Sequence, residues 1–236
     1  MSVSQVLVPE CQPPSRFTSF RELTAPIDWL ATVAKLPSLL RAPKGDGRPV
    51  LLAPGYLTDE FSMWPLKRFL SHLNYDTYDW GLGRNLGDVD EDIVRMGERV
   101  EKLYAELQRP ITLIGWSLGG VIAREVTRLF PESVAEVMTL GTPITGGPKY
   151  TAVGKQFAAL KNLDLDAFEK HVFERNSIGF SQPVTSIFSK TDGVVGWQAS
   201  LDVYNPQARN ICVKGSHLGL GINPQVWKII ANILSK

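Results

Sequence analysis

The feature that most constrains the fold of this chain is an alternation, after residue 49, of short apolar runs with longer helical patterns. Residues 50–53 are wholly apolar, as expected for a strand buried on both faces of a sheet. The clearest helical pattern places five apolar residues on one face: Ile93, Met96, Val100, Leu103 and Leu107. Further strands are expected at about 75–80, 111–116, 134–140, 183–189 and 208–213. The alternation predicts an α/β protein with a mainly parallel central sheet and helices on both faces.

The N-terminal part of the chain precedes this alternation. Residues 1–19 contain Pro, Ser and Gln without any period and predict an extended arm. Thr24 and Pro26 then suit the start of a helix, and Pro37 should end or kink it. We therefore predict an N-terminal arm and helix over residues 1–48.

A second departure from the alternation lies between the fourth and fifth predicted strands. Residues 141–182 carry two helical patterns, near 151–162 and 165–175, in a stretch too long for an ordinary loop. The interpretation is a small helical cap or lid inserted into a core that comprises residues 49–140 and 183–236. The alternative is a pair of ordinary helices that cover the sheet.

Composition excludes several classes of protein. The chain has 236 residues and a formal net charge of +1, with no Lys/Arg cluster of the kind that binds nucleic acid. No apolar run approaches the ~18 residues of a membrane span. The N-terminus lacks the basic start and apolar centre of a secretory signal, which predicts a cytoplasmic protein unless a signal has been removed. Cys11 and Cys212 are predicted to be unlinked thiols, and the histidine spacing predicts no metal site.

One pentapeptide in the alternation indicates chemistry. Residues 115–119 read Gly-Trp-Ser-Leu-Gly and match G-x-S-x-G, between the strand at 111–116 and a predicted helix at 119–129. This strand–turn–helix setting holds a serine hydroxyl out at the carboxyl edge of a sheet. Glycines on both sides of the serine remove side chains that would collide with the backbones of the strand and helix. The context predicts that Ser117 is a nucleophile rather than a buried serine in a tight turn.

Four segments carry a wider resemblance. LLAPGYLTD, GWSLGG, FSKTDGVVGW and GSHLGLG resemble an α/β-hydrolase of the esterase/lipase group, which implies that fold over roughly residues 49–236. GWSLGG is also similar to the motif of carboxyl-ester esterases that act on small or carrier-bound esters, and PGY to a loop of cutinase-like polyester hydrolases. The chain departs from both: it lacks the His-Gly pair that many esterases carry at positions 54–55, and Trp116 stands where cutinase-like enzymes usually have His.

The general base and its supporting acid are expected downstream, because the chain order in this fold is Ser, then Asp or Glu, then His. Of the two histidines after Ser117, His171 lies in the predicted cap, before any candidate acid. His217 lies in a Gly-rich loop after the last strand and is the predicted base. Asp192 follows the fifth strand and is predicted to fix the imidazole tautomer. Asp202 is the second candidate for the acid.

Two backbone N–H groups should stabilise the oxyanion of a tetrahedral intermediate. One is expected from Leu118, and the other from the loop that Gly55 turns, with Tyr56 the first candidate and Leu57 the second. Bulky side chains near strand ends could line an apolar substrate pocket, although aromatic residues are also common in cores. The predicted pocket residues are Tyr56, Leu57, Trp64, Trp80, Trp116 and Trp197.

These residues predict a serine hydrolase that cleaves carboxylic esters, of the esterase or lipase type, through an acyl-enzyme on Ser117. An acyltransferase, a thioesterase or an amidase would use the same triad. A non-catalytic binding protein on this fold would normally lack a triad member. The expected partner is a small-molecule or lipid-like ester, with no cofactor. Weak interfacial contact with a membrane is a further alternative, because the helix near 25–40 and the cap could supply an apolar face.

Overall fold

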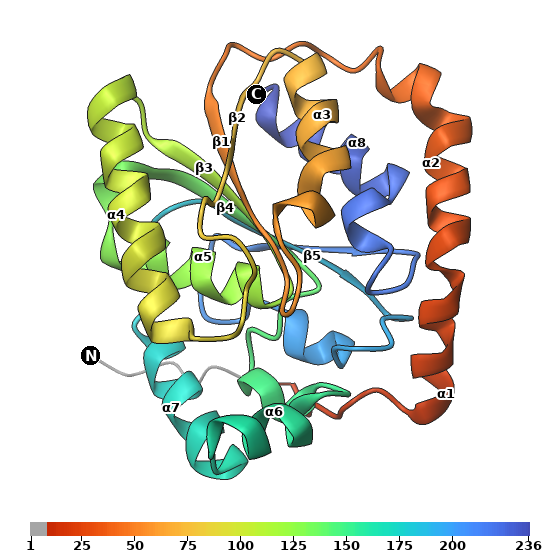
Figure 1. Ribbon diagram of the computed structural model, residues 1–236, viewed down its shortest axis with the longest axis vertical. Helices are drawn as coiled ribbons and strands as arrows, with labels where there is room; N and C mark the ends of the chain where they lie inside the picture. The colour runs from red at the N-terminus through yellow and green to blue at the C-terminus, as the bar shows by residue number, and fades with distance from the viewer. Residues whose placement is uncertain (1–8) are drawn as a thin grey trace.

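The computed structural model of the protein describes residues 9–236, and a six-stranded parallel sheet forms its centre (Figure 1). The strand order is β2-β1-β3-β4-β5-β6, and every neighbouring pair is parallel. All six strands lie where the alternation predicts them. They are β1 (Pro49–Ala53), β2 (Asp76–Asp79), β3 (Ile111–Trp116), β4 (Val134–Leu140), β5 (Val184–Ser189) and β6 (Arg209–Val213).

Helices cover both faces of the sheet, which confirms the predicted α/β-hydrolase class of fold. One apolar core lies between the sheet and α3 and α8, and the other between the sheet and α4 and α5 (Figure 1). Residues of β1 and β3 contribute to both cores, because their side chains alternate between the faces. The α-helices are α1 (Arg16–Ser19), α2 (Ala25–Leu39), α3 (Trp64–His72), α4 (Val89–Leu107), α5 (Leu118–Leu129), α6 (Gly154–Lys161), α7 (Leu165–Ser177) and α8 (Pro224–Leu234).

The N-terminal segment differs from its prediction in two respects. The predicted extended arm is wrong at its end, because α1 begins at Arg16 and the 3₁₀ helix η1 (Phe20–Thr24) follows it directly. Residues 9–15 form no helix or strand, and the earlier part of the predicted arm, residues 1–8, lies outside the described residues. Helix α2 begins after Thr24 as predicted but continues through Pro37 to Leu39. Only half a turn follows this proline, so its missing N–H removes a bond near an exposed helix end, where the cost is small.

Helix α2 has an unusual polarity. Ile27 and Leu30, in the first half of the helix, are 64% and 67% exposed. The inward face instead carries polar residues near its start, with Thr32 buried and its hydroxyl donating to the carbonyl of Ile222. Packing against α8 begins only further along, where Leu39 is buried. The polar side of the first half of α2 therefore faces the loops that follow the last strands.

The loops at the carboxyl ends of the strands meet at one edge of the sheet. The register aligns Ala53 with Gly115, and Leu140 with both Trp116 and Ile187. The chain also runs from β1 to the edge strand β2 and returns to the other side of β1 as β3. Such a reversal leaves a crevice beyond the carboxyl ends of the strands, where ligands bind in open α/β sheets.

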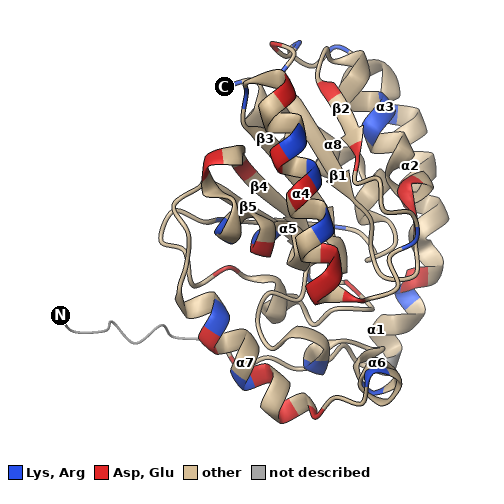
Figure 2. Ribbon diagram, turned by 60° about the vertical axis from the view of Figure 1, so that its left-hand side comes forward, with Lys and Arg blue, Asp and Glu red and all other residues tan. Residues whose placement is uncertain are grey.

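Helices α6 and α7, which connect β4 to β5, lie together at this end of the molecule (Figure 1). An antiparallel bridge between Thr151 and Val195 ties the start of this connection to the loop after β5. The start of α4 is acidic, with Asp90, Glu91 and Asp92 in its first turn, whereas basic and acidic residues alternate along the rest of α4 and lie side by side on α7 (Figure 2). No helix within residues 9–236 has the length and apolar character needed to cross a membrane.

Candidate active site

Ser117 occupies the turn between β3 and α5, in a backbone conformation that is unfavourable for residues with a Cβ atom. Its φ and ψ are 52° and −119°, which lies in a left-handed region that glycine adopts most readily. Its N–H donates to the carbonyl of Leu140 (2.8 Å), while its own carbonyl accepts from the N–H of Gly120 and the hydroxyl of Thr142, both at 3.0 Å. These three bonds hold the strained turn in place, and the side chain is partly exposed.

The glycines around Ser117 permit a close approach of three backbone segments. A Cβ at Gly115 would collide with the start of α5, and one at Gly119 would collide with the carbonyls of Ala53 and Pro54. The strand, the helix and the loop after β1 could not pack at this distance with larger residues. The motif therefore needs glycine at these positions because larger side chains would keep the three segments apart, which is the reason predicted from the sequence.

Asp192 and His217 form a buried pair at the same edge of the sheet. The Nδ1 atom of His217 lies 2.7 Å from Oδ2 of Asp192. The other oxygen of Asp192 accepts from the N–H groups of Val194 (2.9 Å) and Val195 (2.7 Å), which fixes the carboxylate in its loop. Burial alone lowers the pKa of His217, but the charge and hydrogen bond of Asp192 outweigh it, so the pKa lies above its usual 6.5.

Gly141 connects this pair with the serine turn. It follows Leu140, the acceptor of the Ser117 N–H, and a Cβ here would come within 2.9 Å of Asp192 Oδ2 and 3.0 Å of His217 Nδ1. Trp116 adds a second link, because its indole N–H donates to the carbonyl of His217 (3.2 Å). No hydrogen bond joins Ser117 to His217 within the described residues. Such bonds are often long in unliganded sites and shorten when substrate binds.

The two predicted oxyanion donors flank Ser117. Leu118 is the first residue of α5, so its N–H belongs to the unbonded first turn of the helix. The N–H of Tyr56, on the loop after β1, has no acceptor among the described residues. Leu57, the second candidate, donates its N–H to the carbonyl of Asn85 (2.7 Å) and has a positive φ of 61°. Tyr56 therefore has the free donor of the two.

A partly open, mainly apolar cavity lies beside Ser117. Tyr56 and Leu118 contribute to its wall, and helices α6 and α7 cover it with apolar side chains. Phe157 of α6 packs edge-on against the Tyr56 ring, with centroids 5.3 Å apart. Its further apolar lining comprises Val89, Val121, Pro143, Ile144, Val153, Phe168, Val172, Val194 and Val195.

The other residues predicted for the pocket lie away from this cavity. Trp80 is fully buried in the core beneath α4, because its ring fills space between the sheet and the helix. Trp64 is half exposed and stacks on Phe61, while Trp197 stacks on Phe188. Trp116 is buried against the ring of His217, and Leu57 points outward.

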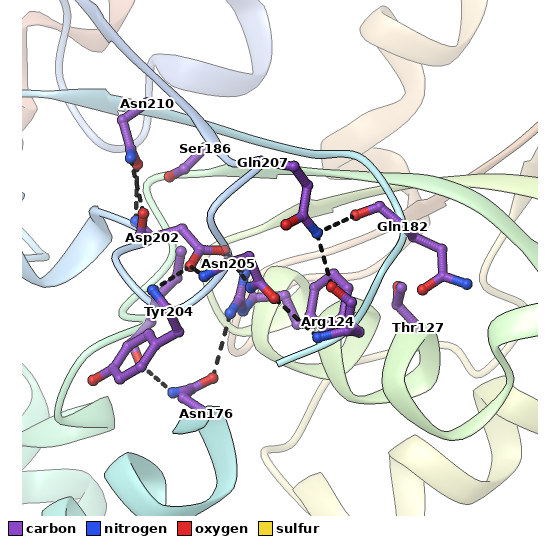
Figure 3. A network of polar contacts seen from close by, with 12 residues as sticks. Arg124, Thr127, Asn176, Gln182, Ser186, Asp202, Tyr204, Asn205, Gln207 and Asn210 are labelled. Atoms are coloured by element: carbon purple, nitrogen blue, oxygen red, sulfur yellow. Dashed lines mark hydrogen bonds and ion pairs between the residues drawn. The ribbon is translucent and has the colours of Figure 1, made fainter. Parts of the chain in front are cut away.

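Asp202, the second candidate for the acid, belongs to a separate polar network (Figure 3). Its carboxylate pairs with Arg124 of α5, and the two side chains are 0% and 2% exposed. Asn176 also contacts Arg124 and reaches the carbonyl of Ile144 (2.8 Å). Attraction to Arg124 outweighs burial and lowers the pKa of Asp202. The structure therefore pairs Asp192, and not Asp202, with His217.

The Glu22 side chain lies near the site and is not predicted from the sequence. Glu22, in η1, accepts hydrogen bonds from the N–H groups of Gly193 (2.7 Å), His217 (2.8 Å) and Leu218 (2.8 Å). Nothing in its local sequence indicates this role, since the bonds span more than 170 residues. Only the tertiary packing of the N-terminal segment brings this carboxylate to the loops of the acid and the base.

Comparison with known proteins relates most of the chain to one family. A family model described as "Alpha/beta hydrolase family" matches residues 50–221. A pimeloyl-[acyl-carrier protein] methyl ester esterase of Aliivibrio fischeri is 26% identical over 134 residues, which cover 55% of this chain and 48% of that protein. The chain thus spans about half the length of the curated relatives it matches.

Solved structures show the same fold at low identity. Lipase B of Aspergillus fumigatus superposes with a TM-score of 0.59 at 19% identity, covering 80% of this chain and 52% of that one. The monoacylglycerol lipase of Paleococcus ferrophilus gives a TM-score of 0.60 at 14% identity, covering 82% and 96%.

Proposed function

Since the chain belongs to the α/β-hydrolase family, we propose that it is a serine hydrolase that cleaves carboxylic esters through an acyl-enzyme on Ser117. The observation that carries the proposal is the buried Asp192–His217 bond, which lies at the sheet edge where the strained turn exposes Ser117. Asp192 accepts a hydrogen bond from Nδ1–H, which leaves a lone pair on Nε2 to serve as base.

The reaction would proceed in two steps. In the first, Oγ of Ser117 attacks the ester carbonyl while Nε2 of His217 takes its proton and then passes it to the leaving alcohol. In the second, a water molecule attacks the acyl-enzyme with His217 again as base, and the acid is released. The N–H groups of Tyr56 and Leu118 would stabilise the oxyanion in both steps.

The cavity supports an apolar acyl group as the part of the substrate that is bound. Side chains such as Phe157, Ile144 and Val172 surround the space beside the nucleophile, and their contact with an acyl chain would contribute binding energy in proportion to the area buried. We assign residues 141–182 as the cap that forms this wall. The relatives named as esterases and lipases fit such a substrate. The charged residues of the lining, Arg124, Glu125 and Arg175, are each held in an ion pair.

An active-site fluorophosphonate tests the proposal directly. The wild-type protein should gain one phosphonyl group, located at Ser117 by mass spectrometry of the digested protein, and Ser117→Ala should gain none. His217→Gln should react much more slowly, because the base is lost while the serine remains. A wild-type protein that stays unlabelled, or labelling that survives Ser117→Ala, would refute the proposal.

Esters of increasing chain length test the assignment of the cavity. Phe157→Ala should move the preference of p-nitrophenyl esters toward longer acyl chains, because removal of the ring enlarges the cavity beside Tyr56. Phe173→Ala is the matched control on α7, since this phenylalanine is 43% exposed and packs on Tyr204. Identical chain-length profiles for the two variants would contradict the assignment.

A further inference from the structure

We infer that Glu22 is a positioning residue that fixes the base and its acid relative to each other during catalysis, an inference that rests on the proposed function. Its Oε1 accepts from the N–H groups of Gly193 (2.7 Å) and His217 (2.8 Å), and its Oε2 accepts from Leu218 (2.8 Å). One carboxylate thus binds the residue after the acid, the base itself and the residue after the base. Charge-assisted bonds of this kind are stronger than neutral ones.

The loop of the acid is bridged at Val195 to the start of the β4–β5 connection, whereas side chains make the bonds that join it to the loop of the base. Asp192 follows β5 and His217 follows β6, each beyond the point where the strands stop pairing. Hydroxyl groups of Ser189 and Thr191 reach the carbonyl of Gly215 (2.6 and 2.9 Å), which joins the loops on the sheet side. Glu22 adds a second connection between the loops, at the residue after the acid and at the base itself.

Neighbouring contacts show that the N-terminal segment is built to lie here. The hydroxyl of Ser19 donates to the carbonyl of Gly193 (2.8 Å), and Asp28 of α2 accepts from the N–H (3.3 Å) and hydroxyl (3.2 Å) of Ser216. A Cβ at Gly193 would meet the backbone at Thr18 and Ser19, and one at Gly219 would meet the Asp28 carboxylate. The loops therefore carry glycine where the segment approaches them most closely.

Glu22 acts on the base through its negative charge as well as through its hydrogen bonds. The charged groups near His217 in the described residues are Asp192 from the loop after β5, Glu22 from η1 and Asp28 from α2. Burial lowers the pKa of His217, whereas Asp192 and, less strongly, Glu22 raise it by their negative charge. Removal of the Glu22 charge should therefore move the pH at which His217 loses its proton downward.

Glu22 should affect turnover without affecting substrate binding. It does not line the cavity beside Ser117 among the described residues, so it makes no direct contact with a substrate bound there. It determines instead where the imidazole lies, and small displacements of a catalytic group can cost about 100-fold in rate.

Three substitutions in the intact 236-residue chain separate the effect of side-chain length from the effect of charge. Glu22→Gln keeps the length of the side chain and loses the charge, Glu22→Asp keeps the charge and loses reach, and Glu22→Ala loses both. Glu98→Gln is the matched control, because Glu98 lies exposed on α4 at the opposite side of the molecule (Figure 1). For each variant, kcat and KM for a soluble p-nitrophenyl ester are measured across pH, with the rate of fluorophosphonate labelling and the thermal midpoint.

We expect kcat to fall about 100-fold in Glu22→Ala and about 10-fold in Glu22→Asp, with KM within about twofold. In Glu22→Gln the acidic limb of kcat/KM should move to lower pH, a change that a merely structural residue would not produce. Unchanged kcat and an unchanged acidic limb in all three variants, in a wild type that labels at Ser117, would overturn the inference alone. A wild type that does not label would overturn the proposed function and the inference with it. If Glu22→Ala does not fold, Glu22→Gln and Glu22→Asp decide.

Discussion

The strained turn at Ser117 predicts that the nucleophile costs the protein stability. At φ 52° and ψ −119°, the residue lies close to the first corner of a type II′ turn, about +60° and −120°, which glycine dominates. A residue with a Cβ in such a region costs about 1–3 kcal/mol. Ser117→Gly and Ser117→Ala both remove the hydroxyl, but only glycine removes the Cβ and with it the strain.

The expected difference follows from two opposing terms. Glycine relieves the strain, whereas its freedom in the unfolded chain costs about 0.4–1 kcal/mol relative to alanine. Ser117→Gly should therefore be about 1 kcal/mol more stable than Ser117→Ala, which corresponds to about 2–4 °C in thermal midpoint for a chain of this length. The three backbone bonds of residue 117 are available to both variants, so they should not contribute to the difference.

Thermal unfolding followed by circular dichroism, with urea unfolding as a second measure, gives the comparison. The control is Ala105→Gly on the exposed face of α4, where the same exchange of alanine for glycine should destabilise by about 1 kcal/mol. The sign of the effect should thus reverse between the two sites. A Ser117→Gly protein no more stable than Ser117→Ala would refute the argument that this turn stores strain.

Three further predictions concern other parts of the structure. Asp202→Asn should lower the free energy of unfolding by about 3–5 kcal/mol, because it leaves Arg124 buried without its charged partner. Asp46→Asn, which breaks two exposed pairs, with Arg48 and Arg109, should cost much less, about 1 kcal/mol in the same urea titration, and equal losses would contradict this reasoning. The kcat/KM for a soluble ester should rise with pH along a limb whose midpoint lies above 6.5, because the raised pKa of His217 keeps the base protonated and inactive below it; a midpoint below that value would count against His217 as base. Gly119→Ala should cost about 1–3 kcal/mol in thermal unfolding, because the new Cβ meets the backbone carbonyls after β1, and an unchanged midpoint would show that this packing is looser than described.

The fold could be predicted because its signals are local. A buried parallel strand is apolar over a few consecutive residues, and the turn at Ser117 carries its glycines beside the serine it exposes. The chain order of the family also led from Ser117 to Asp192 and His217, and the structure brings the last two within 2.7 Å. Their catalytic roles remain predictions, as does the division of the chain into core and cap.

The pocket and the N-terminal segment could not be predicted in the same way. A tryptophan near a strand end can fill a core, as Trp80 does, or stack at the surface, as Trp64 does, and the sequence around each is compatible with both. Glu22 contacts residues far along the chain, so no local pattern indicates its partners. These features depend on which elements pack together in the tertiary structure. The hydrophobic periodicity of a single sequence does not indicate those contacts.

The inverted polarity of α2 has a consequence for protein engineering. Design rules that place polar residues outside and apolar residues inside would alter both sides of this segment. On the outer side, polar substitutions at Ile27 and Leu30, which are 64% and 67% exposed, should improve solubility without altering any hydrogen bond. On the inner side, apolar substitutions at Asp28 and Thr32 would detach the helix from the loop that carries the base and from the carbonyl of Ile222. Solubility of this protein can therefore be improved safely from one side of the helix only.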